Sequence, residues 1–123
     1  MIRKILLILA ITSAAFACNG QKNYESVNAE QFATAIATQQ PQIIDARTPE
    51  EFHQGHIPGA QNIDIKSNEF DTQISKLDKS RPVAVYCRSG RRSKMAAERL
   101  VSAGFNVVEL DGGILSWKGE ITQ

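Results

Sequence analysis

The chain has 123 residues, with 14 basic side chains, 13 acidic side chains and two cysteines. A chain of this length builds one small domain around one hydrophobic core, which excludes a two-domain enzyme, a porin and a transporter with several spans. The near balance of charge gives no general attraction to nucleic acid.

The first residues have the pattern of a secretory signal peptide. Arg3 and Lys4 form a basic start, and an uncharged, mostly apolar run follows over 5–17. That run is shorter than the about 20 apolar residues of a membrane-spanning helix, and small residues precede a cleavage site after Ala17. The predicted division of the chain is a signal peptide at 1–17, a polar tether at 18–23 and one folded domain at 24–123.

Cys18 directly follows the predicted cleavage site, and two interpretations of it stay open. Ala15-Phe16-Ala17 fits the Ala-x-Ala pattern of ordinary signal peptidase. The same segment resembles a bacterial lipobox in part, because Ala17 precedes a cysteine, although Ala15 and Phe16 depart from the usual residues. A cysteine at this place is otherwise a coincidence, so the sequence favours lipid attachment at Cys18. Both interpretations predict export. The exported protein is then either periplasmic or attached to the membrane only through the lipid at Cys18.

The domain is predicted to start with a short strand at 25–27. A helix follows, because Asn28 and Gln31 have the spacing of a capping box and Pro41 prevents its extension. Ile43-Ile44 then begins a buried strand.

A second capping box predicts the next helix. Thr48 is spaced to cap it, Pro49 suits its first position, Glu51 completes the box and Gly55 ends it. Another strand is predicted over 61–65.

The second half continues the alternation of helices and strands. Apolar residues have helical spacing over 70–77, and the apolar run at 82–86 is typical of a buried parallel strand, with Cys87 at its C-terminal end. A helix over 93–103 and a strand over 107–110 follow. This alternation predicts an α/β fold with a mostly parallel central sheet flanked by helices.

The chemistry concentrates in one segment, Cys87-Arg88-Ser89-Gly90-Arg91-Arg92-Ser93, between a buried strand and a helix. Ligands of open α/β sheets bind at this edge of the strands. Gly90 permits a tight turn, and a loop that curls ahead of a helix N-terminus aims several backbone N–H groups at one point. That arrangement and the nearby arginines favour a thiolate at Cys87, which is then a nucleophile without a dedicated base.

A buried, unreactive cysteine is the simpler interpretation of Cys87 alone. It does not account for Arg88, Arg91 and Arg92, because the end of a core strand gains nothing from three arginines. No second cysteine follows at CxxC spacing, which argues against thioredoxin-like exchange. Concentrated positive charge on a nearly neutral chain points instead to a small anionic substrate.

Five motifs follow one another in order along the chain. They are Ile44-Asp45-Ala46-Arg47, Glu51-Phe52, Gly55-His56-Ile57-Pro58-Gly59-Ala60 with Asn62, Tyr86 to Ser93, and Gly112-Gly113 before Trp117. With these motifs in this order, the sequence resembles a single-domain rhodanese, a thiosulfate or persulfide sulfurtransferase, and the resemblance covers nearly all of residues 27–117.

The resemblance implies that Cys87 takes sulfane sulfur from a small anionic donor, becomes a persulfide and passes the sulfur to cyanide or a thiol. This is covalent catalysis in two steps, without metal or organic cofactor. A protein that exchanges persulfide sulfur is a further candidate partner. Arg88 and Arg92 are the predicted anion ligands, and Arg91 could instead face solvent. The predicted substrate-binding residues are Arg88, Ser89, Gly90, Arg91 and Arg92.

Three polar residues of the motifs are predicted to support the structure. Asp45 and Arg47 lie at a strand end, where a lone buried charge is costly and an ion pair or a loop-bracing hydrogen bond is favoured. His56 lies in a turn without a set of metal ligands around it, so a structural hydrogen bond is expected there.

Two other functions stay open. Some phosphatases share the fold and use Cys-x5-Arg, but that position counted from Cys87 is Ser93, and the loop is one residue short for a phosphate. A non-catalytic module could instead carry persulfide sulfur to one partner protein or sense redox state. The sequence does not separate a carrier from an enzyme.

Overall fold

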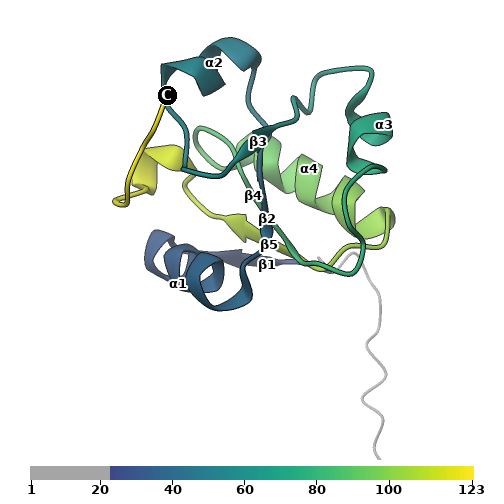
Figure 1. The fold of residues 1–123 in the computed structure, drawn as a ribbon, viewed down its shortest axis with the longest axis horizontal. Helices are drawn as coiled ribbons and strands as arrows, with labels where there is room; N and C mark the ends of the chain where they lie inside the picture. The colour runs from purple at the N-terminus through teal and green to yellow at the C-terminus, as the bar shows by residue number, and fades with distance from the viewer. Residues whose placement is uncertain (1–22) are drawn as a thin grey trace, which may run out of the picture.

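The computed structural model describes residues 23–123, which form a five-stranded sheet with helices on both faces (Figure 1). The strands are β1 (Glu25–Val27), β2 (Gln42–Asp45), β3 (Gln61–Asn62), β4 (Val83–Tyr86) and β5 (Val107–Leu110). The helices are α1 (Ala29–Gln39), α2 (Pro49–Gln54), α3 (Phe70–Ile74) and α4 (Arg91–Ser102), and a 3-10 turn, η1, spans Ile114–Ser116.

The described residues leave part of the sequence-based prediction outside the structure. The predicted signal peptide, Cys18 and all of the tether except Asn23 lie outside them. Within 23–123, no helix has the length and apolar character that crossing a membrane requires.

The sheet has the order β1-β5-β4-β2-β3, and each pair of neighbouring strands is parallel. This confirms the predicted α/β fold. β4 lies between β5 and β2, so a residue that follows β4 stands at the C-terminal edge of the sheet, beside the ends of two other strands.

Alternation along β4 divides the core into two layers. Val83 and Val85 pack with Leu100 in one cluster, on the face that α3 and α4 cover. Ala84 and Tyr86 pack with α1 in the other cluster. Successive side chains of a strand point to opposite faces, and both faces here are covered, which explains why the strand is apolar throughout.

Both predicted capping boxes are present. Asn28 Oδ1 accepts a hydrogen bond from the Gln31 amide at 2.9 Å, and Gln31 Oε1 accepts one from the Asn28 amide at 3.1 Å. At α2, Thr48 and Glu51 exchange the same two bonds, each 3.3 Å long. Each box satisfies two amides that have no partner inside the helix.

The helix after Cys87 starts two residues earlier than the sequence predicted. α4 begins at Arg91 rather than Ser93, because Gly90 has a φ of 101° and serves as its N-cap. The connection from β4 to α4 is therefore only 87–90, and Arg91 and Arg92 lie in the first helical turn.

Two predicted elements are shorter than expected. β3 spans Gln61–Asn62 rather than 61–65, although the Ile63 amide still donates to the Asp45 carbonyl at 2.9 Å. The helix predicted over 70–77 ends as α3 at Ile74, and Leu77 lies in the turn that follows. In both places the apolar residues pack against the core without regular structure.

Candidate active site

Cys87 directly follows β4, at the C-terminal edge of a central strand. Its side chain is free of disulfides and fully buried. The amide of Gly90 donates a hydrogen bond to Sγ at 3.1 Å, and Sγ lies 3.3 Å from the hydroxyl of Ser93. The sulfur thus lies at the N-terminus of α4, where the helix dipole favours negative charge.

The structure places fewer backbone amides at the sulfur than the sequence predicted. Among residues 23–123, Gly90 is the residue whose amide the structure brings within hydrogen-bond distance of Sγ. Arg88, Ser89 and Arg91 are exposed. A single amide, a hydroxyl and the helix N-terminus therefore surround the sulfur, and of the two predicted anion ligands Arg88 is exposed and Arg92 is half-buried.

Glu109 provides a polar group that the sequence analysis did not assign to the site. It lies in β5, and its carboxylate is fully buried on the same face as α4. Oε2 accepts a hydrogen bond from the Ser93 hydroxyl at 2.5 Å, and Oε1 accepts one from Ser26 at 2.6 Å. Lys94 Nζ lies 3.3 Å from Oε1.

The signal for Glu109 was present in the sequence. Val107-Val108-Glu109-Leu110 is a short central strand in which one charged residue interrupts three apolar ones. Carboxylates are rarely fully buried unless they are paired, so a glutamate in such a strand indicates partners. The identity of those partners follows only from the fold.

Arg92 is the predicted anion ligand whose position differs most from expectation. Its guanidinium forms a two-point ion pair with Glu51, with Nη1–Oε1 at 2.6 Å and Nη2–Oε2 at 2.9 Å. The hydrogen bond from Arg92 lowers the pKa of Glu51 to about 2. The bond to Glu51 raises the pKa of Arg92, and a negative charge at Cys87 adds to that rise. Arg92 therefore lies within electrostatic range of the sulfur while it is held by α2.

Asp45 and Arg47 form a buried ion pair at the end of β2. Arg47 Nη2 lies 2.6 Å from Asp45 Oδ2, and Nε lies 3.0 Å from both carboxylate oxygens. The same Nη2 donates to the Gly55 carbonyl at 2.7 Å. Burial opposes a charged guanidinium, but the hydrogen bond and the charge of Asp45 raise the pKa of Arg47. Through these bonds Arg47 connects the chain before α2 to Gly55, where α2 ends.

His56 lies in the turn after α2 and makes local contacts. Its Nδ1 lies 2.9 Å from the Phe52 carbonyl oxygen, and its ring stacks on the Phe52 ring at 3.7 Å. The His56 backbone also exchanges two hydrogen bonds of 2.9 Å with Thr122. Among residues 23–123, no cluster of three or more potential side-chain ligands is placed to hold a metal ion.

The segment after β5 closes over the loop that carries Cys87. The Ile114 amide donates to the Cys87 carbonyl at 2.8 Å, and the Leu115 amide donates to the Arg88 carbonyl at 3.2 Å. Gly113 has a φ of 62°, and a side chain there would overlap the Arg88 carbonyl oxygen. Glycine is therefore required at this close approach of two backbone segments.

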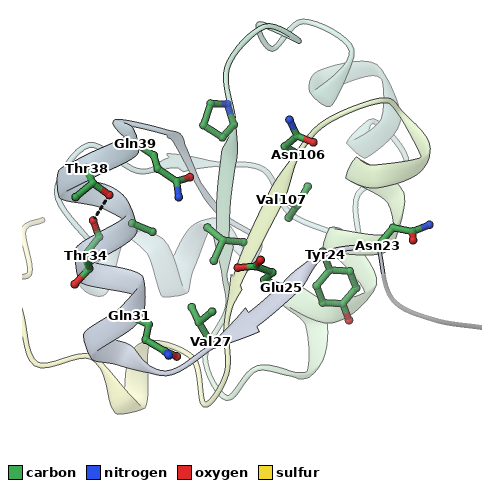
Figure 2. A pocket seen from close by; sticks show the side chains of 13 residues that line it. Asn23, Tyr24, Glu25, Val27, Gln31, Thr34, Thr38, Gln39, Asn106 and Val107 are labelled. Atoms are coloured by element: carbon green, nitrogen blue, oxygen red, sulfur yellow. Dashed lines mark hydrogen bonds between the residues drawn. The ribbon is translucent and has the colours of Figure 1, made fainter. Parts of the chain in front are cut away.

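A hollow of about 600 Å³ lies at the other edge of the sheet, between α1 and the strands β1 and β5 (Figure 2). Thr34 and Thr38 line it from α1, and Figure 2 shows the Thr38 hydroxyl bonded to the Thr34 carbonyl, at 2.8 Å. Pro82 and Asn106, also in its wall, precede β4 and β5, so this is the N-terminal edge of the sheet. Ligands of open α/β sheets bind at the opposite edge, and no cysteine or histidine lines the hollow. We therefore place the candidate active site at Cys87.

Known sequences match this chain over the same region. The model of the family described as the rhodanese-like domain matches residues 28–120. A sulfurtransferase of Allochromatium vinosum is 36% identical over 93 residues, which cover 74% of this chain and 85% of that protein. The thiosulfate sulfurtransferase PspE of Escherichia coli is 41% identical over 71 residues, which cover 58% of this chain and 68% of that protein.

Solved structures agree with the sequence matches. The crystal structure of a rhodanese-related protein from Thermoplasma volcanium has a TM-score of 0.72 at 32% identity and covers 80% of this chain and 98% of that chain. A rhodanese-like domain protein from Staphylococcus aureus has a TM-score of 0.68 at 28% identity and covers 78% of this chain and 93% of that chain. Because the family model spans most of the chain and the parallel sheet carries Cys87 at its C-terminal edge, this chain belongs to the rhodanese-like domain family, and its relatives include sulfurtransferases.

Proposed function

We propose that this protein is a sulfurtransferase that moves sulfane sulfur from thiosulfate or a persulfide donor to a thiophilic acceptor through a persulfide at Cys87. The observation that carries the proposal is the position of Cys87 Sγ, which accepts the Gly90 amide at 3.1 Å at the N-terminus of α4. The relatives named sulfurtransferases support the same class of reaction.

The reaction divides into two displacements at sulfur. The Cys87 thiolate attacks the outer sulfur of thiosulfate, a new S–S bond forms, and sulfite leaves with the electron pair of the broken S–S bond. A thiophile then attacks the outer sulfur of the persulfide, and the electron pair of that S–S bond returns to Cys87. Thiolate and persulfide are both anions, so the Gly90 amide and the helix N-terminus stabilise both states.

The arginines around the loop suit an anionic donor. Arg88 and Arg91 are exposed beside the loop, and Arg92 is half-buried within electrostatic range of the sulfur, where it pairs with Glu51. With the neighbouring Ser89, they remain our candidates for donor binding. Cys87 itself is fully buried, so we expect the exposed loop residues to move aside when a donor reaches the sulfur.

The test is a comparison of Cys87→Ser with Cys18→Ser. Each protein is incubated with thiosulfate, and bound sulfur is measured by intact mass spectrometry and by cyanolysis. We expect the wild type and Cys18→Ser to gain a sulfur atom, and Cys87→Ser to gain none. Sulfur retained by Cys87→Ser would remove Cys87 from this role.

A non-catalytic persulfide carrier is the second candidate. The full burial of Cys87 favours it, because a buried sulfur is shielded from small donors and acceptors until a partner opens the site. Steady-state turnover of thiosulfate with cyanide would support the enzyme over the carrier. A carrier would turn over poorly and would deliver its persulfide sulfur to one partner protein.

A phosphatase is disfavoured by the position of Ser93. The residue that would be arginine in Cys-x5-Arg phosphatases is here a serine that donates to the buried Glu109 carboxylate. A serine at that place supplies no positive charge to bind a phosphate, and its hydroxyl is already engaged by Glu109. Hydrolysis of p-nitrophenyl phosphate that depends on Cys87 would reverse this assignment.

Export of the domain is a separate proposal, based on residues that precede the described part of the chain. The apolar run before Cys18 predicts cleavage and lipid attachment there. Mass spectrometry of the protein from its native membrane should show a diacyl addition on Cys18, and an unmodified N-terminal Met1 would contradict export by this route.

A further inference from the structure

Three buried groups form a continuous path between Cys87 and the interior of the sheet. Cys87 Sγ lies 3.3 Å from Ser93 Oγ, and Ser93 Oγ lies 2.5 Å from Glu109 Oε2. Each of the three residues is fully buried. The nucleophile of the proposed reaction is therefore separated from a carboxylate by a single hydroxyl group, away from solvent.

The hydrogen bonds of this path run in one direction. The Cys87 thiol donates to the Ser93 oxygen, and the Ser93 hydroxyl donates to Glu109. A serine hydroxyl can donate one bond and accept another at the same time, so it can receive a proton on one side while it gives one up on the other.

We propose that Glu109 accepts the proton of Cys87 through Ser93. The S–H bond breaks and its proton moves to Ser93 Oγ, while the Ser93 O–H bond breaks and its proton moves to Glu109 Oε2. A thiol and a carboxylate become a thiolate and a carboxylic acid, with no change in total charge and no redox step. The new Ser93 hydroxyl then donates to the thiolate, which also keeps its hydrogen bond from the Gly90 amide. Glu109 is a positioning residue in this scheme, because it reaches Cys87 only through Ser93.

The other oxygen of Glu109 is held apart from the path. Ser26 of β1 donates to Oε1 at 2.6 Å, and Lys94 lies 3.3 Å from the same oxygen. Lys94 also pairs with Asp111 at 2.9 Å, which shares its positive charge between two carboxylates. Oε2 faces Ser93. The two oxygens thus have different partners, one fixed by α4 and β1 and one directed toward the nucleophile.

At the sulfur end of the path the surroundings favour a thiolate, whereas at the other end the Lys94 cation favours a charged Glu109 and opposes the transfer. Burial raises the pKa of Tyr24, and the negative charge of Glu109 raises it further, so Tyr24 stays a neutral phenol and adds no second anion beside the carboxylate. At the other end, the positive Arg92 lies within electrostatic range of Cys87, with its charge partly offset by Glu51. Moving the negative charge from the sheet interior to the helix N-terminus places it where the dipole is favourable.

The inference rests on the proposed function, but it makes its own prediction about the sulfur-free protein. When one proton is shared inside the Cys87–Glu109 pair, thiolate formation does not release a proton to solvent. The thiolate fraction is therefore independent of pH over the range in which the pair holds one proton. If Glu109 instead stays charged and acts only through its structural hydrogen bonds, its negative charge repels a thiolate at Cys87 and lowers the thiolate fraction.

The decisive variant is Glu109→Gln, which keeps an acceptor oxygen of the same reach but cannot take up a proton. Thiolate is measured by ultraviolet absorbance across pH on cyanide-treated full-length protein, as the difference from a matched Cys87→Ser form. We expect a plateau for the wild type and, for Glu109→Gln, a thiolate signal that falls about tenfold for each pH unit below its midpoint. Equal or greater thiolate in Glu109→Gln at neutral pH would overturn the proposal.

Further variants keep the test decisive if Glu109→Gln does not fold. Ser93→Ala cuts the path and should lose the plateau, whereas Ser93→Thr keeps the hydroxyl and should retain it. Ser26→Ala is the matched control, because Ser26 contacts only the other carboxylate oxygen. Infrared difference spectra should show a carboxylic acid band that Glu109→Gln lacks, and its absence from the wild type would overturn the proposal. A protein that keeps the plateau but transfers no sulfur would contradict the proposed function alone.

Discussion

Arg92 and Glu51 join α4 to α2 through two short hydrogen bonds, 2.6 and 2.9 Å long. Each residue lies in the first turn of its helix, so the pair connects the segment after β4 to the segment after β2 at the C-terminal edge of the sheet. The arginine that the sequence assigns to donor binding therefore has a carboxylate partner. An anionic donor has to compete with that carboxylate for the same guanidinium.

The first prediction concerns this competition. Glu51→Gln should lower the KM for thiosulfate by about two- to fivefold, because it removes a negative charge and frees Arg92 for the donor. Arg92→Ala should raise the KM, since it removes the cation. Steady-state turnover of thiosulfate with cyanide measures both. Glu50→Gln is the matched control, because Glu50 is an exposed carboxylate in the same helical turn.

An unchanged KM in Arg92→Ala would show that another residue binds the donor. Arg88 and Arg91, both exposed, are the next residues to replace. An increase of the KM in Glu51→Gln would mean that the carboxylate orients Arg92 for binding instead of competing with the donor.

The same ion pair predicts a pH dependence of stability. The pKa of Glu51 is lowered from 4.5 to about 2 in the folded protein. Because the folded value lies below the unfolded value, the pair contributes fully above pH 4.5 and loses its contribution as the pH falls toward 2. Glu51→Gln should therefore lower the free energy of unfolding by about 1 kcal/mol at neutral pH and by much less in strong acid.

Urea unfolding at several pH values measures this difference. The fluorescence of Trp117 reports the transition, since it is the one tryptophan of the chain and its ring packs against Phe32. A difference between wild type and Glu51→Gln that stays constant from neutral pH to strong acid would contradict an ionic origin.

The buried pair of Asp45 and Arg47 should respond more strongly. Arg47→Met leaves the fully buried Asp45 without its cation, which should cost about 3–5 kcal/mol of unfolding free energy. The double variant Asp45→Leu with Arg47→Met removes both charges and should be more stable than Arg47→Met alone. Urea unfolding distinguishes the outcomes, and a double variant less stable than the single one would show that the pair contributes more than neutralisation.

Gly113 should tolerate no side chain. Gly113→Ala places a methyl group against the Arg88 carbonyl oxygen at a φ of 62°, and we expect a loss of about 3 kcal/mol or more, with reduced sulfur loading at Cys87. Gly104→Ala is the control, because Gly104 has a φ of 100° and no atom within 4 Å of the added group. It should lose only about 1 kcal/mol from backbone strain and should load sulfur normally. Equal losses in the two variants would show that strain, and not the overlap, decides the effect.

Much of the local structure could be predicted from the sequence, because short-range interactions determine it. The capping boxes at Asn28 and Thr48 each join residues three positions apart, so their spacing alone identifies the starts of α1 and α2. The apolar run at 82–86 predicted a buried parallel strand with Cys87 at its C-terminal end, and the structure has both. The wrong boundaries are the start of α4, which depends on a left-handed glycine, and the ends of β3 and α3, which depend on where strand pairing and helical hydrogen bonding stop.

The partners of the site residues could not be predicted in this way, because they come from distant parts of the chain. Arg92 was predicted to face a donor, but the fold places Glu51, 41 residues away, against it. Glu109 was read only as part of a strand, yet it meets Ser93, 16 residues away, because β5 lies beside β4 and faces α4.

The sequence by itself determined the succession of strands and helices along the chain, the family motifs and the position of Cys87 before a helix N-terminus. Only the tertiary structure decided which carboxylate holds Arg92 and which one lies behind Ser93. The reason is physical: caps and periodic apolar patterns act between residues close in the chain, whereas the order of strands in the sheet brings together side chains from separate segments. A charged residue in an apolar strand shows that a partner exists, and the packing of the sheet against α4 determines which partner it is.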